Sequence, residues 1–596
     1  MYLQALKPHA RTYLLRLTRE SKLSITSQPP GEITAPLAQR IGWAVLILIT
    51  LYVCYFSHLG VIGFVGPDEP RYAWIARDMA ETGDWVTPRL YGKPWFEKPP
   101  FLYWGSALFF KLFGSSAPEV AARLPSAISA LLATLALAWL AWRICGEECA
   151  RWLLLLLPTS VGMIGFSHAA ATDMPFAGML TIAMVCAAVV LGLVSKNENT
   201  PILPRTPWLA LVLFGFFLGL AVLAKGPAAI ILSGGAVFFW AIFTKRWRDA
   251  LRLLHPAALA SFCVTALPWY ILCARRNPDF FRIFIIEHNF KRYLTPEFQH
   301  VQPFWFYVPV LLVAFLPWSF LIVASTVAGI RQWWRNKETS SLTCLVFCWA
   351  MFCLVFFTIS KSKLPGYVLP AVPAIAFLGA RAIAGVTWFS RRVAGYCLIG
   401  GSVVYFVTTI YFRFGLPRIH SYPNTSWELA VLLILVFGMY ALATFFAGYS
   451  LSFNSDSRPN FAFRTTSVLM LVLLMELVPF EFAKTQLNVL SGKWLANILK
   501  PSDVEVDRLR TFGLRRDDHY ALNFYLHHSV PAWTDDPLRD GYVLARSANC
   551  TTLKSHDHCS ETWGSRNIPS GWALLRITPN HSLERPGGGR QPRQEE

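Results

Sequence analysis

The sequence predicts a polytopic α-helical membrane protein, and its composition and its hydropathy carry this prediction. Of the 596 residues, 54% are hydrophobic and only 15% are charged, and the mean hydropathy is +0.41. Apolar runs of roughly 17 to 25 residues recur along the chain, and a helix of that length crosses a hydrocarbon core of about 30 Å. These observations exclude an ordinary soluble domain for most of the chain.

The apolar runs predict about thirteen transmembrane helices. Hydropathy separates them least well where two spans meet with almost no connection, as at Lys225. The predicted spans lie at 41–64, 124–143, 152–167, 174–194, 208–224, 227–243, 255–274, 303–328, 342–359, 365–386, 393–412, 427–449 and 465–480.

The positive charges predict the orientation of these spans, because Lys and Arg near membrane helices collect on the cytoplasmic side. Basic residues in the N-terminal arm, residues 1–40, place this arm in the cytoplasm and make the first span a retained anchor. Alternating crossings of a transmembrane domain at 41–480 then put a loop at 65–123 and the C-terminal region on the outer face. Four Lys and Arg side chains are predicted on the outer face, against the preference of basic residues for the cytoplasmic side. An anion-binding site would explain their position. They are Arg275, Arg276, Lys361 and Lys363.

The C-terminal region changes character, because short alternating stretches replace the long apolar runs. HYALNFYLHH, DGYVLARS and GWALLRIT are interpreted as strands and turns of a small mixed domain at 481–585. The tail at 586–596 is predicted to be disordered. Cys550 and Cys559 lie in this outer domain, where a disulfide is permitted but not required. The sequence contains no metal-ligand spacing of cysteines and no nucleotide-binding motif, so a nucleotide cofactor and a nucleic-acid partner are not expected.

The loop after the first span contains acidic residues close to basic ones. Asp68 and Glu69 precede Arg71 in GPDEPRY, and prolines flank both acids, which predicts rigid, non-helical turns. A carboxylate at this place has the chemistry of a general base toward an attacking hydroxyl, or of a cation ligand. The alternative is a solvated acid that pairs with Arg71 or Arg77.

Glu97 and Lys98 form the second charged group of this loop, in WFEKPPF. Lys98 has the chemistry to bind a phosphate as a point charge. Glu97 is a candidate ligand of a divalent metal together with His288, although three or four ligands would be expected. The alternative is an ion pair between the two neighbours.

Asp173 follows the predicted outer turn that contains His168. An Asp before Met174-Pro175 fits an N-cap position, and it fits equally a second catalytic carboxylate at the membrane level of Asp68. His168 is expected to form local hydrogen bonds rather than to bind a ligand.

Three further candidates are predicted on the outer side. Lys225 lies between two spans with almost no loop, Arg292 lies in the outer stretch EHNFKRY, and Tyr367 lies at the membrane boundary in KLPGYVLP. Each allows two interpretations: phosphate binding near the membrane surface, or ordinary snorkelling and interfacial anchoring. One topology nevertheless places all of these candidates on the same side of the membrane, where unrelated loop charges would scatter. This coincidence favours a shared site.

Taken in order, GPDEPRY with WFEKPPF, TDMPF, GLAVLAKGP, EHNFKRY with HVQPFWFYVPV, and SKSKLPGYVLP resemble the aminoarabinose transferase family that modifies lipid A. More broadly they resemble the GT-C superfamily of polyprenyl-phosphate-sugar-dependent glycosyltransferases, which includes protein O-mannosyltransferases. The resemblance covers residues from about 41 to 380. It implies a GT-C fold and inverting sugar transfer from an undecaprenyl phosphate donor, at the outer face of the bacterial inner membrane.

The resemblance also implies roles for individual residues. Asp68 matches the acid near the acceptor, and Asp173 matches the second-loop acid. Glu97 and His288 match a possible metal site. Lys98, Arg292 and Tyr367 match positions that bind the lipid phosphate, whereas the resemblance leaves the role of Lys225 open. Beside these matches, Glu69 is expected to be a further catalytic acid, and Lys225 and Arg71 are expected to contribute to donor-phosphate binding. Gly366 departs from the pattern, since family members often carry a larger residue there, and the divergent C-terminal region leaves a lipid A-like or a protein acceptor open.

Two other functions remain as alternatives. One is another sugar-lipid transferase with a different acceptor, such as a protein O-mannosyltransferase. The other is a lipid-sugar transporter, whose ionisable residues would lie near the midplane of paired halves. Because the charges here cluster at helix ends on one side, the sequence favours a transferase.

Overall fold

A computed structural model describes most of the membrane domain and parts of the C-terminal region. Residues up to Leu48 form one compact unit and residues from Ile49 onward form a second. The described residues are 37–114, 116–194, 207–291, 301–336, 340–384, 391–415, 426–453, 492–499, 504–537, 540–546, 559–563 and 572–577.

The membrane domain consists of long apolar helices. Each predicted span from 41–64 to 427–449 coincides with one of these helices or with consecutive helices, whereas 465–480 lies outside the described residues. The helices are α2 (Leu37–Tyr55), α5 (Pro118–Cys145), α6 (Glu147–Leu156), α7 (Val161–Ser167), α8 (Asp173–Val190), α9 (Trp208–Lys225), α10 (Ala228–Thr244), α11 (Trp247–Leu251), α12 (Pro256–Arg276), α14 (Tyr307–Ala314), α15 (Ser319–Asn336), α16 (Ser341–Ile359), α17 (Val372–Ile383), α18 (Arg391–Gly415) and α19 (Ser426–Phe453). Shorter turns are η1 (Arg252–Leu254), the π-helix η2 (Arg282–Lys291) and η3 (Pro365–Ala371).

Length and composition make several of these helices able to cross a membrane. Among the described residues, 5 helices qualify, or up to 7 if each bent pair is one span. The bends are 62° between α6 and α7 and 120° between α14 and α15. Pro158 lies at the first break and Pro317 at the second. A proline favours such a break, because it removes a helical hydrogen bond and clashes with the preceding turn.

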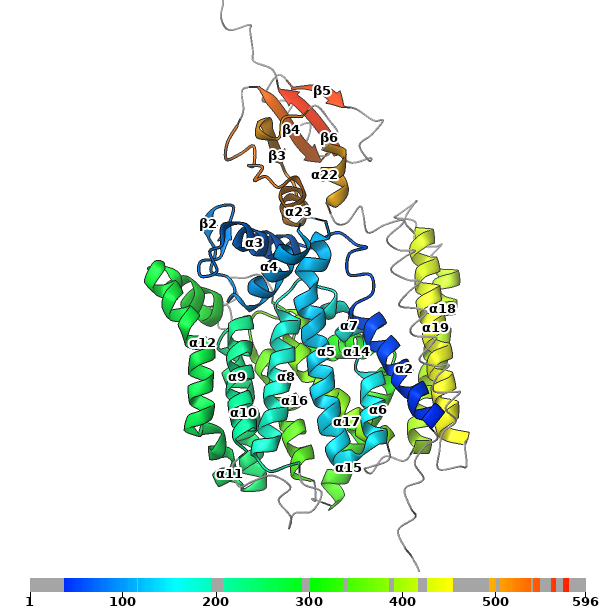
Figure 1. Cartoon of the computed structure of the whole chain (residues 1–596). Helices are drawn as coiled ribbons and strands as arrows, with labels where there is room; N and C mark the ends of the chain where they lie inside the picture. Colours follow the sequence, from blue (N-terminus) through cyan, green and yellow to red (C-terminus); the bar gives the residue numbers. More distant parts are fainter. Residues whose placement is uncertain are drawn as a thin grey trace, which may run out of the picture. The chain divides into compact units, whose positions relative to one another are not determined.

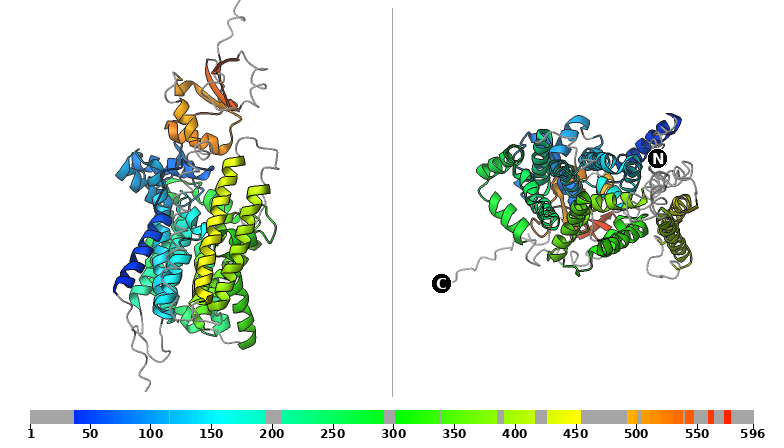
Figure 2. Two further views of the ribbon diagram at one scale, coloured as in Figure 1. Left: turned by 90° about the vertical axis from the view of Figure 1, so that its right-hand side faces the viewer. Right: turned by 90° about the horizontal axis from the view of Figure 1, so that it is seen from below.

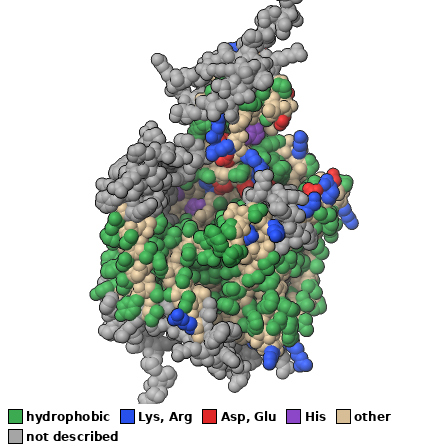
Figure 3. Space-filling model, turned by 180° about the vertical axis from the view of Figure 1, so that it is seen from behind, with side chains coloured by type: hydrophobic (Ala, Val, Ile, Leu, Met, Phe, Trp, Pro, Cys, Tyr) green, Lys and Arg blue, Asp and Glu red, His purple; other side chains and the backbone are tan. Residues whose placement is uncertain are grey.

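The flanks of the helices expose large apolar side chains. Such a surface would promote aggregation in water, but it is compatible with the hydrocarbon core of a lipid bilayer. Val264 on α12 is 75% exposed and Leu209 on α9 is 72% exposed. Figure 3 shows hydrophobic side chains over most of the helical flank, with charged groups nearer its ends. The protein is therefore a multi-pass membrane protein.

The loop between α2 and α5 folds into the helix α3 (Asp68–Thr82), the apolar helix α4 (Phe101–Phe113) and a short hairpin of β1 (Arg89–Leu90) and β2 (Lys93–Pro94). The prediction of non-helical turns around Asp68 and Glu69 is wrong, because both acids belong to the first turn of α3. Pro70 is compatible with this helix, since the first amides of a helix have no intrahelical acceptor. The two acids also match the positive end of the helix dipole.

The described C-terminal residues form a small mixed unit. It contains α22 (Lys493–Leu499), η6 (Val506–Arg508), α23 (Arg516–Leu526) and a four-stranded sheet in the order β3-β4-β6-β5. The strands are β3 (Leu509–Phe512), β4 (Gly541–Arg546), β5 (Cys559–Trp563) and β6 (Trp572–Ile577), and only β3 and β4 pair in parallel. Cys550, one partner of the disulfide left open above, lies outside the described residues.

Two of the three predicted C-terminal strands are present, as β4 and β6, whereas HYALNFYLHH forms most of the helix α23. Tyr520 and Phe524 stand four residues apart in this stretch, as do Ala521 and Tyr525, and this spacing serves a helix face as well as a strand. In the structure this stretch is helical, and the helix buries Ala521, Leu522 and Phe524.

The helices α3 and α4 lie between the membrane helices and α23. In Figures 1 and 2 they cover one end of α5, α8 and α9, and α23 packs on α3. Phe64, Tyr72, Tyr103 and Phe524 belong to one buried apolar cluster that joins these segments. The candidate site is built at this end.

Candidate active site

The first part of the site is a charged group at the start of α3. Arg71 donates through Nη2 to Asp68 and through Nη1 to Glu97 Oε2 at 3.1 Å, and its Nε donates to the carbonyl of Pro67 at 3.0 Å. The Arg71 side chain is only 5% exposed, whereas that of Asp68 is 52% exposed. Lys98 Nζ lies 3.7 Å from Glu97 Oε1. Arg71 thus fixes two carboxylates while Asp68 remains accessible.

These charges act on the neighbouring ionisable groups. Burial by itself lowers the pKa of Arg71, but Glu97 and Asp68 outweigh burial and raise it. Burial, followed by the charge of Glu97, raises the pKa of Tyr72 and of Tyr103. Arg71 therefore stays charged and both phenols stay neutral across the physiological pH range.

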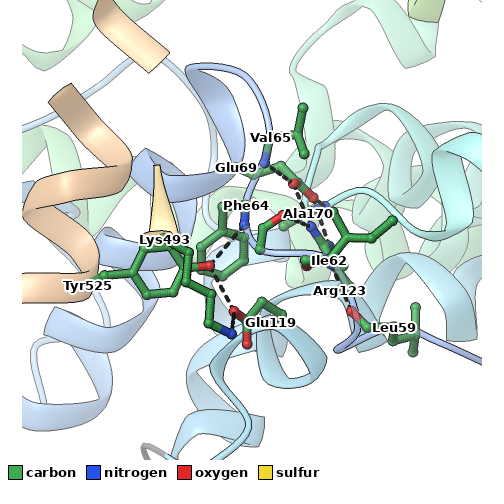
Figure 4. A network of polar contacts seen from close by, with 11 residues as sticks. Leu59, Ile62, Phe64, Val65, Glu69, Glu119, Arg123, Ala170, Lys493 and Tyr525 are labelled. Carbon is green, nitrogen blue, oxygen red and sulfur yellow. Dashed lines mark hydrogen bonds and ion pairs between the residues drawn. The ribbon is translucent and has the colours of Figure 1, made fainter. Parts of the chain in front are cut away.

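Glu69 belongs to a separate buried network, drawn in Figure 4. Its carboxylate accepts two hydrogen bonds from Arg123, Nε to Oε1 at 3.0 Å and Nη2 to Oε2 at 2.8 Å. It also accepts hydrogen bonds from the backbone amides of Val65, at 2.8 Å, and of Ala170, at 2.7 Å. With both oxygens engaged inside the protein, Glu69 has the geometry of a structural anchor, which does not fit the expected catalytic role.

Arg123 carries the rest of this network. Its guanidinium donates to the carbonyls of Leu59 at 2.8 Å, Ile62 at 2.7 Å and Gly63 at 3.1 Å. Arg123 lies on α5, so this one side chain ties the chain before α3 to a membrane helix. Through Ala170, Glu69 also ties the start of α3 to the turn before α8.

The second part of the site gathers Asp173, Lys225 and Tyr367 from three different helices. Lys225 Nζ lies 2.5 Å from Asp173 Oδ1 and 4.6 Å from the ring centroid of Tyr367. Asp173 is the first residue of α8, its N-cap position is taken by Thr172, and the cap side chain makes no hydrogen bond. The N-cap prediction for Asp173 is therefore wrong, and its carboxylate pairs with Lys225 instead.

Gly366 completes this second part, although the sequence marked it only as a departure from a pattern. A Cβ placed on Gly366 would stand 2.5 Å from Asp173 Oδ1 and 2.9 Å from Phe166. The missing side chain is what lets Asp173 reach the backbone of η3.

The two parts lie on neighbouring elements. Phe96, which precedes Glu97, shares a buried apolar cluster with Leu223, which lies two residues before Lys225. The Glu69–Ala170 hydrogen bond connects the start of α3 with the turn that leads to Asp173. The start of α3 thus lies next to the start of α8, and the end of α9 lies beside the same end of α8.

Some predicted site residues cannot be placed. Arg292 lies outside the described residues, and His288 lies on η2 but its side chain is not among those described. In the described part of the chain, no three or more His, Cys, Asp or Glu come together as metal ligands. The divalent metal remains a prediction.

Two of the cations that broke the charge rule have protein partners. Lys363 is buried and donates to the carbonyls of Ser360 at 2.8 Å and Gln302 at 3.1 Å. Arg276 forms an ion pair with Asp84 at 3.1 Å. For these two, protein contacts replace the expected anion site. His168 behaves as predicted, because its ring nitrogens contact the carbonyls of Ile164 and Ser57.

The C-terminal unit docks beside the site through a buried acid that sequence reasoning missed. Glu119, at the start of α5, is 3% exposed and accepts hydrogen bonds from Lys493 Nζ at 2.6 Å and from the Tyr525 hydroxyl at 2.7 Å. The Tyr525 hydroxyl in turn accepts a hydrogen bond from the backbone amide of Phe64 at 2.9 Å (Figure 4). The only sequence signal was an acid and a basic residue, Glu119 and Arg123, one helical turn apart just before an apolar run.

Comparisons with known proteins identify the family of this chain. A family model described as dolichyl-phosphate-mannose-protein mannosyltransferase matches residues 42–284. An undecaprenyl phosphate-alpha-4-amino-4-deoxy-L-arabinose arabinosyl transferase of Serratia proteamaculans is 30% identical over 415 residues, which are 68% of this chain and 71% of that protein. The Pseudomonas aeruginosa protein of the same name is 31% identical over 414 residues, 68% of this chain and 71% of that protein. The match to the Erwinia tasmaniensis protein spans 58% of its length, at 31% identity.

A solved structure shares the fold. ArnT from Cupriavidus metallidurans, crystallised bound to undecaprenyl phosphate, superposes with a TM-score of 0.73 at 22% identity and covers 90% of this chain and 99% of its own. The fold is therefore the helical membrane fold of GT-C type, as the motifs predict. Together with the matches above, this places the chain in the undecaprenyl phosphate-alpha-4-amino-4-deoxy-L-arabinose arabinosyl transferase family.

Proposed function

We propose that this protein is a membrane glycosyltransferase that moves one aminoarabinose-type sugar from an undecaprenyl phosphate donor to a lipid A-like acceptor. The single observation that carries the proposal is a pair of charged groups on neighbouring elements, each built from segments far apart in the sequence. Arg71 holds Asp68 and Glu97 in one group, and Lys225 pairs with Asp173 in the other. Family membership supplies the substrate class.

In this reaction the bond between the sugar carbon and the phosphate oxygen breaks, and the phosphate keeps the electron pair. Cations near the leaving oxygen stabilise the charge that develops there. Lys98 and Lys225 carry this charge in the proposal, with Tyr367 beside Lys225. Arg292 is proposed as a further phosphate ligand on sequence grounds alone.

Asp68 is the proposed residue at the acceptor. Its carboxylate is accessible, and Arg71 fixes it. If the acceptor is a hydroxyl, Asp68 accepts its proton as the new bond forms. If the acceptor is a phosphate, no proton has to leave, and Asp68 only orients the reacting group. Asp173, held by Lys225, is proposed as the second carboxylate of the site.

Arg71 is reassigned in this proposal. Its Nε–H and one N–H on each of its two terminal nitrogens already serve protein acceptors. We therefore propose that Arg71 positions Asp68 and Glu97 and does not bind the donor phosphate. Glu97 with His288 remains the proposed metal site, and a divalent cation there would supply electrophilic stabilisation of the phosphate.

We also propose the finer topology. The chain crosses the inner membrane about thirteen times, with its N-terminus in the cytoplasm. The site and the C-terminal domain lie on the outer face. The basic N-terminal arm and the family's helical layout support this orientation.

Protein as acceptor is the second candidate. The match of residues 42–284 to a protein mannosyltransferase model favours it specifically. A lipid-sugar transporter is the remaining alternative, and the clustering of charges at helix ends argues against it.

The test is sugar transfer by the purified full chain in detergent, from a labelled synthetic undecaprenyl phosphate sugar. We expect label on lipid A, little on a peptide acceptor, and a loss of at least about a hundredfold in Asp68→Asn. Asp507→Asn is the matched control, because the Asp507 side chain is 90% exposed and lies in the C-terminal unit. Transport without transfer, or transfer only to peptide, would contradict the proposal.

A further inference from the structure

One face of α23 lies along α3, which belongs to the loop at 65–123, called the catalytic loop below. Tyr520, Phe524 and His527 share this face, at spacings of four and three residues. The ring centroid of Tyr520 stands 5.3 Å from the guanidinium carbon of Arg71. One turn further, Arg77 donates to the carbonyl of Phe524 at 3.0 Å, and its guanidinium lies 4.2 Å from the Phe524 ring centroid. The C-terminal unit therefore touches the helix that carries the candidate acceptor residue.

The contact with Arg71 differs from the others because Arg71 is part of the site. Its N–H groups point at Asp68, Glu97 and the carbonyl of Pro67, which leaves the guanidinium face for other contacts. Trp95 and Tyr520 lie within the range of a cation–π interaction with that guanidinium, at 5.6 and 5.3 Å. Trp95 comes from the catalytic loop, but Tyr520 comes from the C-terminal unit.

We propose that Tyr520 is a positioning residue of the transferase site, and that the C-terminal unit thereby contributes a residue to the site. This inference rests on the proposed function for its catalytic consequence, but its structural half stands on the contacts alone. Tyr520 acts through Arg71, which in turn orients Asp68.

The physical argument is one of orientation. Arg71 is almost fully buried, so its cation–π contacts are stronger than they would be in water. Tyr91 also stacks on Tyr520, with 6.5 Å between ring centroids and 26° between ring planes, which restricts the Tyr520 ring further. Without the Tyr520 ring, the guanidinium gains freedom to tilt, and the accessible carboxylate of Asp68 loses its fixed direction. A misdirected acid slows the chemical step more than it weakens substrate binding.

The experiment compares Tyr520→Leu and Tyr520→Phe in the full chain in detergent. Phe keeps the ring and Leu removes it. We expect Tyr520→Phe to retain kcat within about twofold, and Tyr520→Leu to lower kcat about tenfold while the KM for the donor stays within about twofold. Rescue by the phenylalanine variant separates ring contact from any role of the hydroxyl.

Tyr542→Leu is the matched control. Tyr542 lies on β4, and Arg576 stands 5.7 Å from its ring centroid, so the variant removes a similar contact away from the site. We expect Tyr542→Leu to leave kcat unchanged. An equal loss of kcat in Tyr542→Leu and Tyr520→Leu would overturn the positioning role, because general damage to the C-terminal unit would then explain both.

Hydrogen exchange of α3 supplies a readout that needs no activity. We expect faster amide exchange across residues 68–82 in Tyr520→Leu than in Tyr520→Phe or Tyr542→Leu. If the wild-type chain transfers no sugar to any acceptor, the proposed function fails, but exchange still decides whether Tyr520 holds α3. Unchanged exchange together with unchanged kcat in Tyr520→Leu would overturn the inference.

Discussion

Asp173 lies directly against the backbone of Gly366. A Cβ at position 366 would stand 2.5 Å from Oδ1 of Asp173, the same oxygen that receives the ion pair from Lys225. In this chain, Gly366 therefore leaves the space in which the acid on α8 pairs with the lysine on α9. The effect is one of space, since the contact involves side-chain atoms of Asp173 and Phe166.

Gly366→Ala is therefore expected to reduce sugar transfer about tenfold or more, because the methyl group pushes Asp173 away from its place. Transfer rate and thermal unfolding are both measured in detergent. Gly234→Ala is the control, since a Cβ at Gly234 on α10 meets nothing within 4 Å. Equal activity of the two alanine variants would contradict the steric argument.

Substitutions of the neighbouring acids Asp68 and Glu69 are expected to affect different properties, sugar transfer for Asp68 and stability for Glu69. Glu69→Gln leaves the buried guanidinium of Arg123 without a counter-ion, and losing one partner of such a pair costs about 3 to 5 kcal/mol. The unfolding temperature of Glu69→Gln should therefore fall. Asp68→Asn should keep the wild-type unfolding temperature and lose transfer, because Asp68 is half exposed.

These two variants control each other, since they alter adjacent carboxylates to amides of the same size. The expectation is wrong if Glu69→Gln unfolds like the wild type and loses only kcat. In that case the carboxylate of Glu69 would act in the reaction despite its four hydrogen bonds.

The sequence predicted most of the helices, because a membrane requires long apolar runs whatever the tertiary fold. It also predicted that Asp173, Lys225 and Tyr367 share one side of the membrane, since counting spans suffices for that. It failed at the start of α3, where prolines were interpreted as breaking a helix although they are well tolerated in a first turn.

The sequence alone did not predict which residues far apart in the chain contact each other. Nothing in the local pattern says that Glu69 meets Arg123, or that Tyr520 meets Arg71, because packing and not periodicity selects these partners. The stretch around Tyr520 was moreover assigned to a strand, since apolar residues four apart satisfy both a strand and a helix. A helix face was needed to bring Tyr520 and Phe524 to α3.

Tyr525→Phe should loosen the contact between the C-terminal unit and the chain before α3. The variant removes the hydroxyl that accepts the Phe64 amide and donates to Glu119, and a buried group left without its partner costs about 1 to 3 kcal/mol. We expect faster hydrogen exchange at residues 59–66. Tyr542→Phe serves as control, and unchanged exchange in Tyr525→Phe would show that Lys493 alone holds Glu119.

His519 makes the stability of the C-terminal unit depend on pH. The amide of Val530 donates to Asn523 Oδ1 at 3.1 Å, so the Asn523 amino group faces His519 Nε2 at 3.2 Å, which must accept and therefore be unprotonated. Burial lowers the pKa of His519, and Asp535 offsets only part of this effect.

Because the folded pKa of His519 is depressed, the unfolded chain binds the proton first. Stability is fully present above the unfolded value of about 6.5 and is lost as pH falls toward the folded pKa. The protection factors of the α23 amides, which are corrected for the intrinsic exchange rate at each pH, should therefore fall as pH is lowered from 7.5 to 5. His519→Gln keeps a donor and an acceptor without a titratable ring, so most of this fall in protection should be absent in the variant. A fall in protection that His519→Gln retains in full would assign the pH dependence to another group.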